Sequence, residues 1–155
     1  MVDKVNDMSE KLADDVFESI HSLMHLYRAQ QYRVLRDGPH DLTHMEYKVM
    51  SFFAAHPDAT LRELVQRSGR DKAQLARLIK ELRDKDLLQG QVDEEDRRIT
   101  RLRLTPDGHA VHETLQRQGQ FLNEVAVQGL SIEEREQLLA LLERVGANLR
   151  GSSTE

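Results

Sequence analysis

The sequence predicts a mainly α-helical fold with one small β-hairpin. Apolar residues recur at helical spacing through most of the 155 residues, whereas the stretch from Ile99 to Leu104 alternates with period two. Capping-box patterns, in which Ser or Thr precedes Glu by three residues, mark three helix starts: Thr43/Glu46, Thr60/Glu63 and Ser131/Glu134. Together these signals predict six helices and a two-stranded antiparallel hairpin.

The first two predicted helices are separated by a turn at residues 37–39. The first is long, because apolar residues recur at helical spacing up to Asp37-Gly38-Pro39: Leu12, Val16, Ile20, Leu23, Tyr27 and Val34. The second runs from Thr43 to about Ala55. It stops there because the ring of Pro57 disfavours a helical conformation at the preceding His56.

The next two predicted helices are short and joined by a tight turn. One spans Leu61 to about Arg67, and a turn at Ser68-Gly69 leads to another from about Lys72 to Lys85. Four apolar residues of this fourth helix fall at i, i+3, i+4 and i+7 and must face the core: Leu75, Leu78, Ile79 and Leu82. Two short helices with a glycine-bearing turn predict a helix-turn-helix.

The predicted hairpin follows the fourth helix. Residues 89–92 pair with the alternating strand, and the segment 93–98 between them is too polar for burial, so it forms an exposed tip, or wing. Thr105-Pro106 then starts a fifth helix that reaches about Gln128, because threonine is a good N-cap and proline suits the first helical position. A sixth helix follows Gly129, and residues 151–155 are predicted to be a disordered tail.

Composition excludes several classes of protein. The chain has no cysteine, which rules out a disulfide framework, a thiolate nucleophile and a cysteine-built zinc site. No apolar run is long enough to cross a bilayer, so we expect no membrane partner and a reducing, cytoplasmic location. No nucleophile elbow, phosphate-binding glycine loop or dinucleotide fingerprint is present, so we expect neither an enzyme nor a cofactor.

The charge is unevenly distributed along the chain. The formal net charge is -5, which is unusual for a protein that binds nucleic acid. However, residues 60–104 contain 12 of the 22 Lys and Arg residues but only 9 of the 27 Asp and Glu residues. This asymmetry indicates a DNA-facing segment on an acidic scaffold.

The fourth helix carries the candidate DNA contacts, because the second helix of a helix-turn-helix enters the major groove. Opposite its apolar stripe, Arg77 and Gln74 can each form two hydrogen bonds to a base edge, and small Ala73 and Ala76 permit close approach. Lys72 and Lys80 suit phosphates, and Arg97 and Arg98 at the wing suit a minor groove. The predicted DNA-binding set is therefore Lys72, Ala73, Gln74, Arg77, Lys80, Arg97 and Arg98. The alternative is an ordinary solvated helix face and an ordinary polar turn.

The order of these motifs resembles the multiple-antibiotic-resistance regulator (MarR) family. The resemblance spans nearly the whole chain. Five segments carry it, in this order: the helix opening at Leu42-Thr43, the segment Leu61 to Gly69, the helix from Asp71 to Leu78, the wing Asp96-Arg97-Arg98, and Leu104-Thr105-Pro106-Asp107-Gly108. One departure is Asp86, where the family usually has glycine. Asp tolerates the left-handed conformation better than most residues, so we expect the same turn.

The resemblance implies a winged-helix homodimer that binds a pseudo-palindromic operator in double-stranded DNA. Residues 1–40 and 106–150 would form the dimerisation helices, and residues 41–105 the winged helix-turn-helix DNA-binding region. The sequence supports dimerisation independently, because the terminal helices carry more apolar positions than one small lobe can cover. The resemblance further implies a repressor that releases DNA when a small anionic or aromatic effector binds. His25, Arg28, Tyr32 and Tyr47 could border such an effector site, but for the two tyrosines we favour the alternative that they are partly buried packing residues.

Two alternative functions stay open from sequence. A metal-responsive, zinc-type regulator would use histidine pairs at ligand spacing, which are His21/His25, His40/His44 and His109/His112. We favour no metal, since surface and interface histidines are common. A helical protein-interaction module without DNA binding would explain the long terminal helices, but it leaves the arginines of the hairpin without a purpose.

Overall fold

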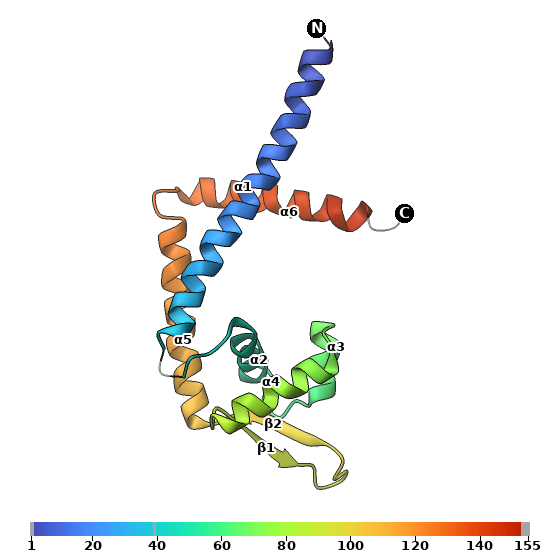
Figure 1. Ribbon diagram of the computed structural model, residues 1–155, viewed down its shortest axis with the longest axis vertical. Coiled ribbons are helices and arrows are strands. Elements are labelled where there is room, and N and C mark those ends of the chain that lie inside the picture. Colours follow the sequence, from blue (N-terminus) through green and yellow to red (C-terminus); the bar gives the residue numbers. More distant parts are fainter. Residues whose placement is uncertain (1, 39, 153–155) are drawn as a thin grey trace. The chain divides into compact units, whose positions relative to one another are not determined.

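The computed structural model describes residues 2–38 and 40–152 and contains six helices and one hairpin (Figure 1). The elements are α1 (Val2–Arg36), α2 (His44–Ala55), α3 (Leu61–Ser68), α4 (Lys72–Asp84), β1 (Leu88–Val92), β2 (Thr100–Leu104), α5 (Pro106–Ala126) and α6 (Ile132–Ser152). They form two compact units, of which one reaches to Gln118 and the other starts at Gly119, within α5. The predicted winged-helix fold class and its order of elements are confirmed.

The core of the first unit lies between α2, α4 and the hairpin. Phe53 and Met50 of α2 and Leu82 of α4 are completely buried there, with Leu87 from the turn before β1. All four residues of the predicted apolar stripe of α4 are buried: Leu75, Leu78, Ile79 and Leu82. This burial fixes which side of α4 faces outward.

The hairpin is fastened to the loop between α2 and α3. Strands β1 and β2 pair antiparallel, with Leu88 opposite Leu104 and Gly90 opposite Leu102. On its other edge, Leu102 donates its N–H to the carbonyl of Ala59 at 2.9 Å and accepts the N–H of Asp58, also at 2.9 Å. The root of the wing is thus held on both sides.

The structure contains hydrogen bonds at the helix starts where the sequence predicts capping boxes, and it contains the turn expected at Asp86. Thr43 and Glu46 form a complete capping box, with both the side-chain and the reciprocal backbone bond present. Thr60 accepts the N–H of Glu63 at 3.2 Å and so caps α3 through one bond. Asp86 has a φ of 58°, which confirms the left-handed turn expected where the family usually has glycine.

The second unit contains the end of α5 and all of α6. Gly129 adopts a φ of 87° in the turn, and Ser131 and Glu134 form the predicted capping box through hydrogen bonds of 3.0 and 3.1 Å. Arg135 braces the same turn by donating to Glu124 and to the carbonyls of Leu130 and Val127. No residue of α6 is buried.

The end of α6 corrects the predicted boundary of the tail. The helix continues through Gly151 and Ser152, which the sequence placed in a disordered tail. The Ser152 hydroxyl donates to the carbonyl of Leu149 at 3.0 Å, a local bond that supports the last turn. The rest of the predicted tail, residues 153–155, lies outside the described residues.

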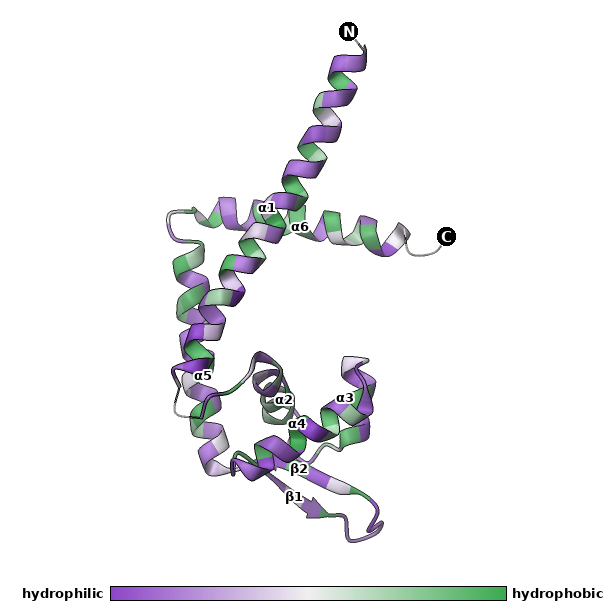
Figure 2. Cartoon of the chain, in the orientation of Figure 1, coloured by the Kyte–Doolittle hydropathy of each residue, from purple (hydrophilic) through white to green (hydrophobic). Residues whose placement is uncertain are grey.

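The terminal helices carry bands of apolar residues, which Figure 2 shows along α1, α5 and α6. Among residues 3–36 of α1, whose burial the structure describes, only Leu35 is buried, whereas several large apolar residues between Val5 and Leu26 are exposed. Within the described parts of the chain, no helix combines the length and apolar character that a membrane span requires.

Candidate nucleic-acid interface

Helix α4 begins at a well-defined N-cap and presents a polar outer side. Gly69 ends α3 in the left-handed conformation, with a φ of 64°, and Asp71 then accepts the N–H of Gln74 at 3.2 Å. With the apolar stripe buried, Ala73, Arg77 and Lys80 are exposed and Gln74 is half-buried. The positions predicted to face outward therefore do so, although Gln74 lies closer to the core than Arg77.

Arg77 is available for an external partner. Its side chain is 68% exposed, and its Nε atom lies 3.9 Å from a carboxylate oxygen of Glu81, one helical turn later. An exposed pair at this distance is weak, so it costs little to break. Arg77 can consequently extend away from α4 toward a base.

The two arginines of the wing differ in their surroundings. Arg98 donates to both carboxylate oxygens of Asp96, through Nε at 3.0 Å and a terminal nitrogen at 3.1 Å. These hydrogen bonds lower the pKa of Asp96 and raise that of Arg98. Arg97 is exposed, and no carboxylate among the described residues forms an ion pair with it. Sequence reasoning assigned both residues one role, but Arg97 is the cation that is not already paired.

Two further arginines fasten β2 rather than facing outward freely. Arg103 binds Asp58 through Nε at 2.8 Å, and this hydrogen bond is the main cause of the lowered pKa of Asp58. Arg101 lies 3.6 Å from Asp93 and donates to the carbonyl of Asp58 at 3.3 Å. Asp58 itself has a φ of 67°, and its turn brings both groups toward β2. Arg103 and Arg101 thereby connect β2 to the loop between α2 and α3.

A nearly buried ion pair connects the ends of α2 and α4. The Lys85 Nζ atom lies 2.8 Å from Glu46, whose side chain is 3% exposed and which also belongs to the capping box of α2. Removing one partner would leave the other without a counter-charge. This pair fixes α4 on α2 and thereby the direction in which α4 projects.

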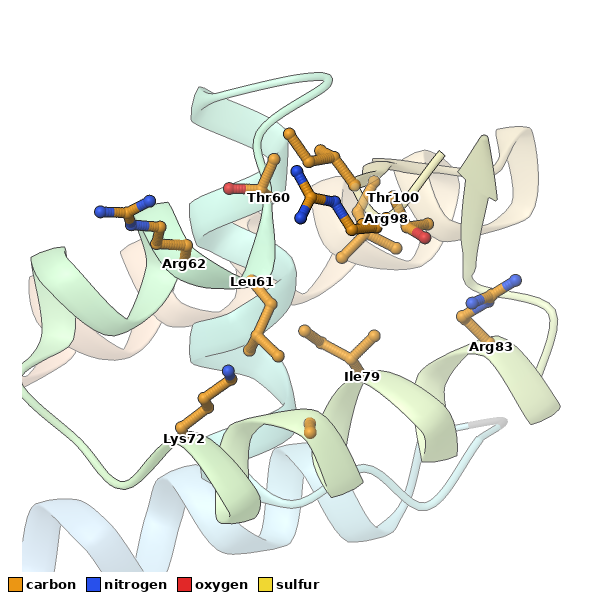
Figure 3. A pocket seen from close by; sticks show the side chains of 11 residues that line it. Thr60, Leu61, Arg62, Lys72, Ile79, Arg83, Arg98 and Thr100 are labelled. Carbon is orange, nitrogen blue, oxygen red and sulfur yellow. The ribbon is translucent and has the colours of Figure 1, made fainter. Parts of the chain in front are cut away.

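A basic groove lies between α3, α4 and the root of the wing (Figure 3). Its cavity volume is about 390 Å³, and Leu61 and Ile79 form part of its lining. Four cationic side chains from three elements surround it: Arg62 of α3, Lys72 and Arg83 of α4, and Arg98 of the wing. Sequence reasoning predicted Lys72 and Arg98 but missed Arg62 and Arg83. The spacing of Lys72, Ala76 and Arg83, at i, i+4 and i+11, was the signal that places Arg83 on this side of α4.

One histidine of the pairs considered as metal ligands has a packing role in the structure. His112 is buried against α2, where its ring stacks on Tyr47 at 5.5 Å and its Nε2 lies 3.1 Å from the Ser51 hydroxyl. The Ser51 hydroxyl also lies 3.0 Å from the carbonyl of Tyr47, so His112 joins a hydrogen-bonded contact with α2. Burial lowers the pKa of His112, and nearby His109 adds to the effect. Among the described residues, no three His, Asp or Glu side chains converge as a metal site would require.

Two of the four residues weighed for an effector site, Tyr47 and Tyr32, contact neighbouring side chains. Tyr47 is half-buried in its contact with His112, and Tyr32 is exposed with the Arg36 guanidinium 5.5 Å from its ring centre. Neither observation singles out a ligand.

Known proteins match both the sequence and the fold. A model of the MarR family matches residues 40–99. YybA of Bacillus subtilis, an HTH-type transcriptional regulator, is 33% identical over 109 residues, which cover 70% of this chain and 73% of YybA. The chain belongs to the MarR family. MarR-family proteins are transcriptional regulators, which confirms the expectations of a regulator and of a protein that is not an enzyme.

Solved structures of MarR-family proteins share the fold. A MarR mutant from E. coli, solved with operator DNA, is 25% identical and has a TM-score of 0.64, covering 82% of this chain and 93% of that chain. FabT of Streptococcus pneumoniae, solved in complex with DNA, has a TM-score of 0.80 at 19% identity and covers 89% of this chain and 97% of that chain. The fold of the MarR family therefore extends beyond the residues that the family model matches.

Proposed function

We propose that this MarR-family regulator binds a pseudo-palindromic operator in double-stranded DNA as a homodimer and represses transcription. The observation that carries the proposal is α4, whose buried leucine stripe leaves Ala73, Arg77 and Lys80 exposed beside the wing. The E. coli MarR structure with operator DNA supports it, since that protein is similar to this chain in sequence and fold.

Each predicted contact has a distinct role in this proposal. Arg77 and Gln74 read base edges in the major groove, and Ala73 permits close approach. Lys72 and Lys80 bind phosphates, which contribute affinity without sequence information. Arg97 enters the adjacent minor groove, and Arg98, which Asp96 orients, lies beside it.

The proposal of a homodimer rests on the uncovered apolar residues of the terminal helices. Phe121 is 72% exposed and Ile132 is 70% exposed, and α6 adds exposed leucines along its length. Monomeric proteins rarely leave contiguous apolar surface of this extent in water. A second copy of the chain would cover these residues and place two α4 helices about 34 Å apart, one turn of the duplex.

Two finer parts of the proposal concern regulation and location. We place the protein in the cytoplasm, where it would meet its proposed partner, double-stranded DNA. We also propose that a small anionic or aromatic effector releases the DNA, as the resemblance to the family implies.

A gel-shift titration tests the proposal. The DNA would be the region that flanks the protein's own gene, with excess nonspecific competitor and two salt concentrations. We expect saturable binding that survives the competitor and weakens steeply with salt, because phosphate contacts release counterions. Absence of binding at low salt would contradict the proposed function and leave the fold unaffected.

Replacing Arg77 with alanine is expected to weaken operator binding by about 1 to 3 kcal/mol and to relax the preference at one base pair. The reason is the loss of two hydrogen bonds to one base edge. The matched variant Arg77→Lys keeps the charge but not the planar donor pair, so it should retain the salt dependence and still lose the base preference. The measurement is a titration against a set of operators with single base-pair changes. Unchanged affinity and preference in Arg77→Ala would show that another face of α4 reads the DNA.

A further inference from the structure

The basic groove has the charge expected of a surface that binds an anionic chain. Its lining contains the four cationic side chains shown in Figure 3 and no Asp or Glu. Of the four, Arg98 is already paired with Asp96, which is not part of the lining. This local composition differs from that of the whole chain, whose formal net charge is -5. The apolar floor at Leu61 and Ile79 keeps the cations at the edges of the groove rather than over its centre.

Arg83 has a defined place at one end of the groove. A Cβ atom built on Gly90 of β1 would lie 3.2 Å from the guanidinium carbon of Arg83 and 2.8 Å from the side chain of Thr100. Gly90 does not adopt a positive φ, unlike Gly69 and Gly129, so its conformation does not require glycine. The absent side chain of Gly90 instead leaves room for the Arg83 guanidinium at the root of the wing. No carboxylate of the described residues forms an ion pair with Arg83.

The geometry of duplex DNA indicates which part of the DNA would lie over the basic groove of the protein. If α4 lies in the major groove and the wing in the neighbouring minor groove, one sugar-phosphate strand separates the two. That strand must pass over the protein surface between α4 and the wing. The surface in question is the basic groove, because α4 supplies one wall and residues 98–100 of the wing supply another.

We propose that the basic groove binds this sugar-phosphate strand, and that Arg62 and Arg83 are phosphate-binding residues which position α4 and the wing in their two DNA grooves. The inference rests on the proposed DNA binding and adds two contacts to it. Lys72, the first residue of α4, also lines the groove and binds the same strand. Since phosphates are the same in every sequence, these contacts strengthen binding to operator and unrelated DNA alike.

The test measures binding by fluorescence anisotropy for the operator and for an unrelated duplex, over about 50 to 200 mM salt. The variants are Arg62→Ala, Arg83→Ala, the conservative Arg83→Lys, and Arg117→Ala as a control. Arg117 is exposed on α5 outside the groove, and its substitution removes the same charge. Both groove arginines are exposed, so their replacement should leave the fold intact, which circular dichroism checks.

We expect each groove variant to lose about 100-fold in affinity, because a dimer loses two charge-assisted hydrogen bonds and each contributes about tenfold. The loss should be equal for the operator and the unrelated duplex. The slope of log affinity against log salt should fall by about two, because a dimer loses two phosphate contacts. Arg83→Lys should keep the wild-type slope, and Arg117→Ala should keep both affinity and slope.

The failure of this inference differs from the failure of the proposed function. If the unmodified protein binds neither duplex, the proposed function fails and this inference fails with it. If the unmodified protein binds the operator but Arg62→Ala and Arg83→Ala retain its affinity and slope, only the role of the groove is overturned. A loss confined to the operator would also overturn it, because the two arginines would then be reading bases.

Discussion

Replacing Gly108 with alanine is expected to destabilise the first unit by about 3 kcal/mol or more, because the added Cβ would collide with the main chain. Gly108 is buried in the first turn of α5, and an added Cβ would lie 2.0 Å from the carbonyl oxygen of Leu87. Neither side can move easily. Leu87 is fully buried, and its carbonyl accepts the N–H of Thr105 at 3.1 Å. The Thr105 hydroxyl in turn accepts the N–H of Gly108 at 2.9 Å and donates to the carbonyl of Asp86 at 2.7 Å.

Chemical denaturation followed by circular dichroism measures this effect, and Gly119→Ala provides the matched control. Gly119 lies in the interior of the same helix, and a Cβ there would meet no atom within 4 Å. Alanine at this position should be neutral or should stabilise the protein by up to about 1 kcal/mol, because alanine favours the helix more than glycine does. A Gly108→Ala variant as stable as the original protein would mean that the main chain at Leu87 moves away from α5 without cost.

Features that depend on local sequence could be predicted from the sequence. The apolar stripe of α4 follows directly from helical spacing, and its burial places Arg77 outward without any tertiary information. The left-handed turn at Asp86 and the complete capping box at Thr43 are likewise properties of a few neighbouring residues. Such features are set by the period of the backbone and by its local hydrogen bonds.

Features that depend on distant residues could not be predicted. Arg103 binds Asp58, 45 positions away, and Lys85 binds Glu46, 39 positions away. No local rule pairs these charges, because each chain position has many partners of opposite sign. The groove that brings Arg62 and Arg83 together is also a product of tertiary packing, in which α3, α4 and the wing converge.

The two arginines of the wing illustrate both what local sequence predicts and what only tertiary contacts reveal. The sequence placed both Arg97 and Arg98 at an exposed tip, and the structure places both there. Only the structure distinguishes them, since Asp96 binds Arg98 while Arg97 has no carboxylate partner among the described residues. Arg97 is therefore the main candidate for the proposed minor-groove contact.

Replacing Leu138 and Leu142 of α6 together with glutamine is expected to convert the proposed dimer into monomers and to weaken operator binding at least about 100-fold. Both leucines are exposed on one side of α6 and lie one helical turn apart. Burial of leucine against a second copy is the main source of dimer stability in the proposal, and glutamine removes it while keeping good helix propensity. The loss of DNA affinity follows because a dimer binds its second half-site intramolecularly, whereas monomers must bind each half-site separately.

The measurement combines sedimentation velocity at micromolar protein with a titration of the operator. A matched control, Glu136→Gln with Arg144→Gln, changes two exposed residues of α6 on its other side and leaves the net charge of the chain unchanged. The Leu138→Gln, Leu142→Gln variant is also neutral in charge, so any loss of DNA binding cannot come from electrostatic repulsion. A variant that stays dimeric would show that α6 is not part of the interface. A monomeric variant with undiminished operator affinity would instead show that one winged-helix lobe suffices for recognition, because linking two half-sites would then contribute nothing.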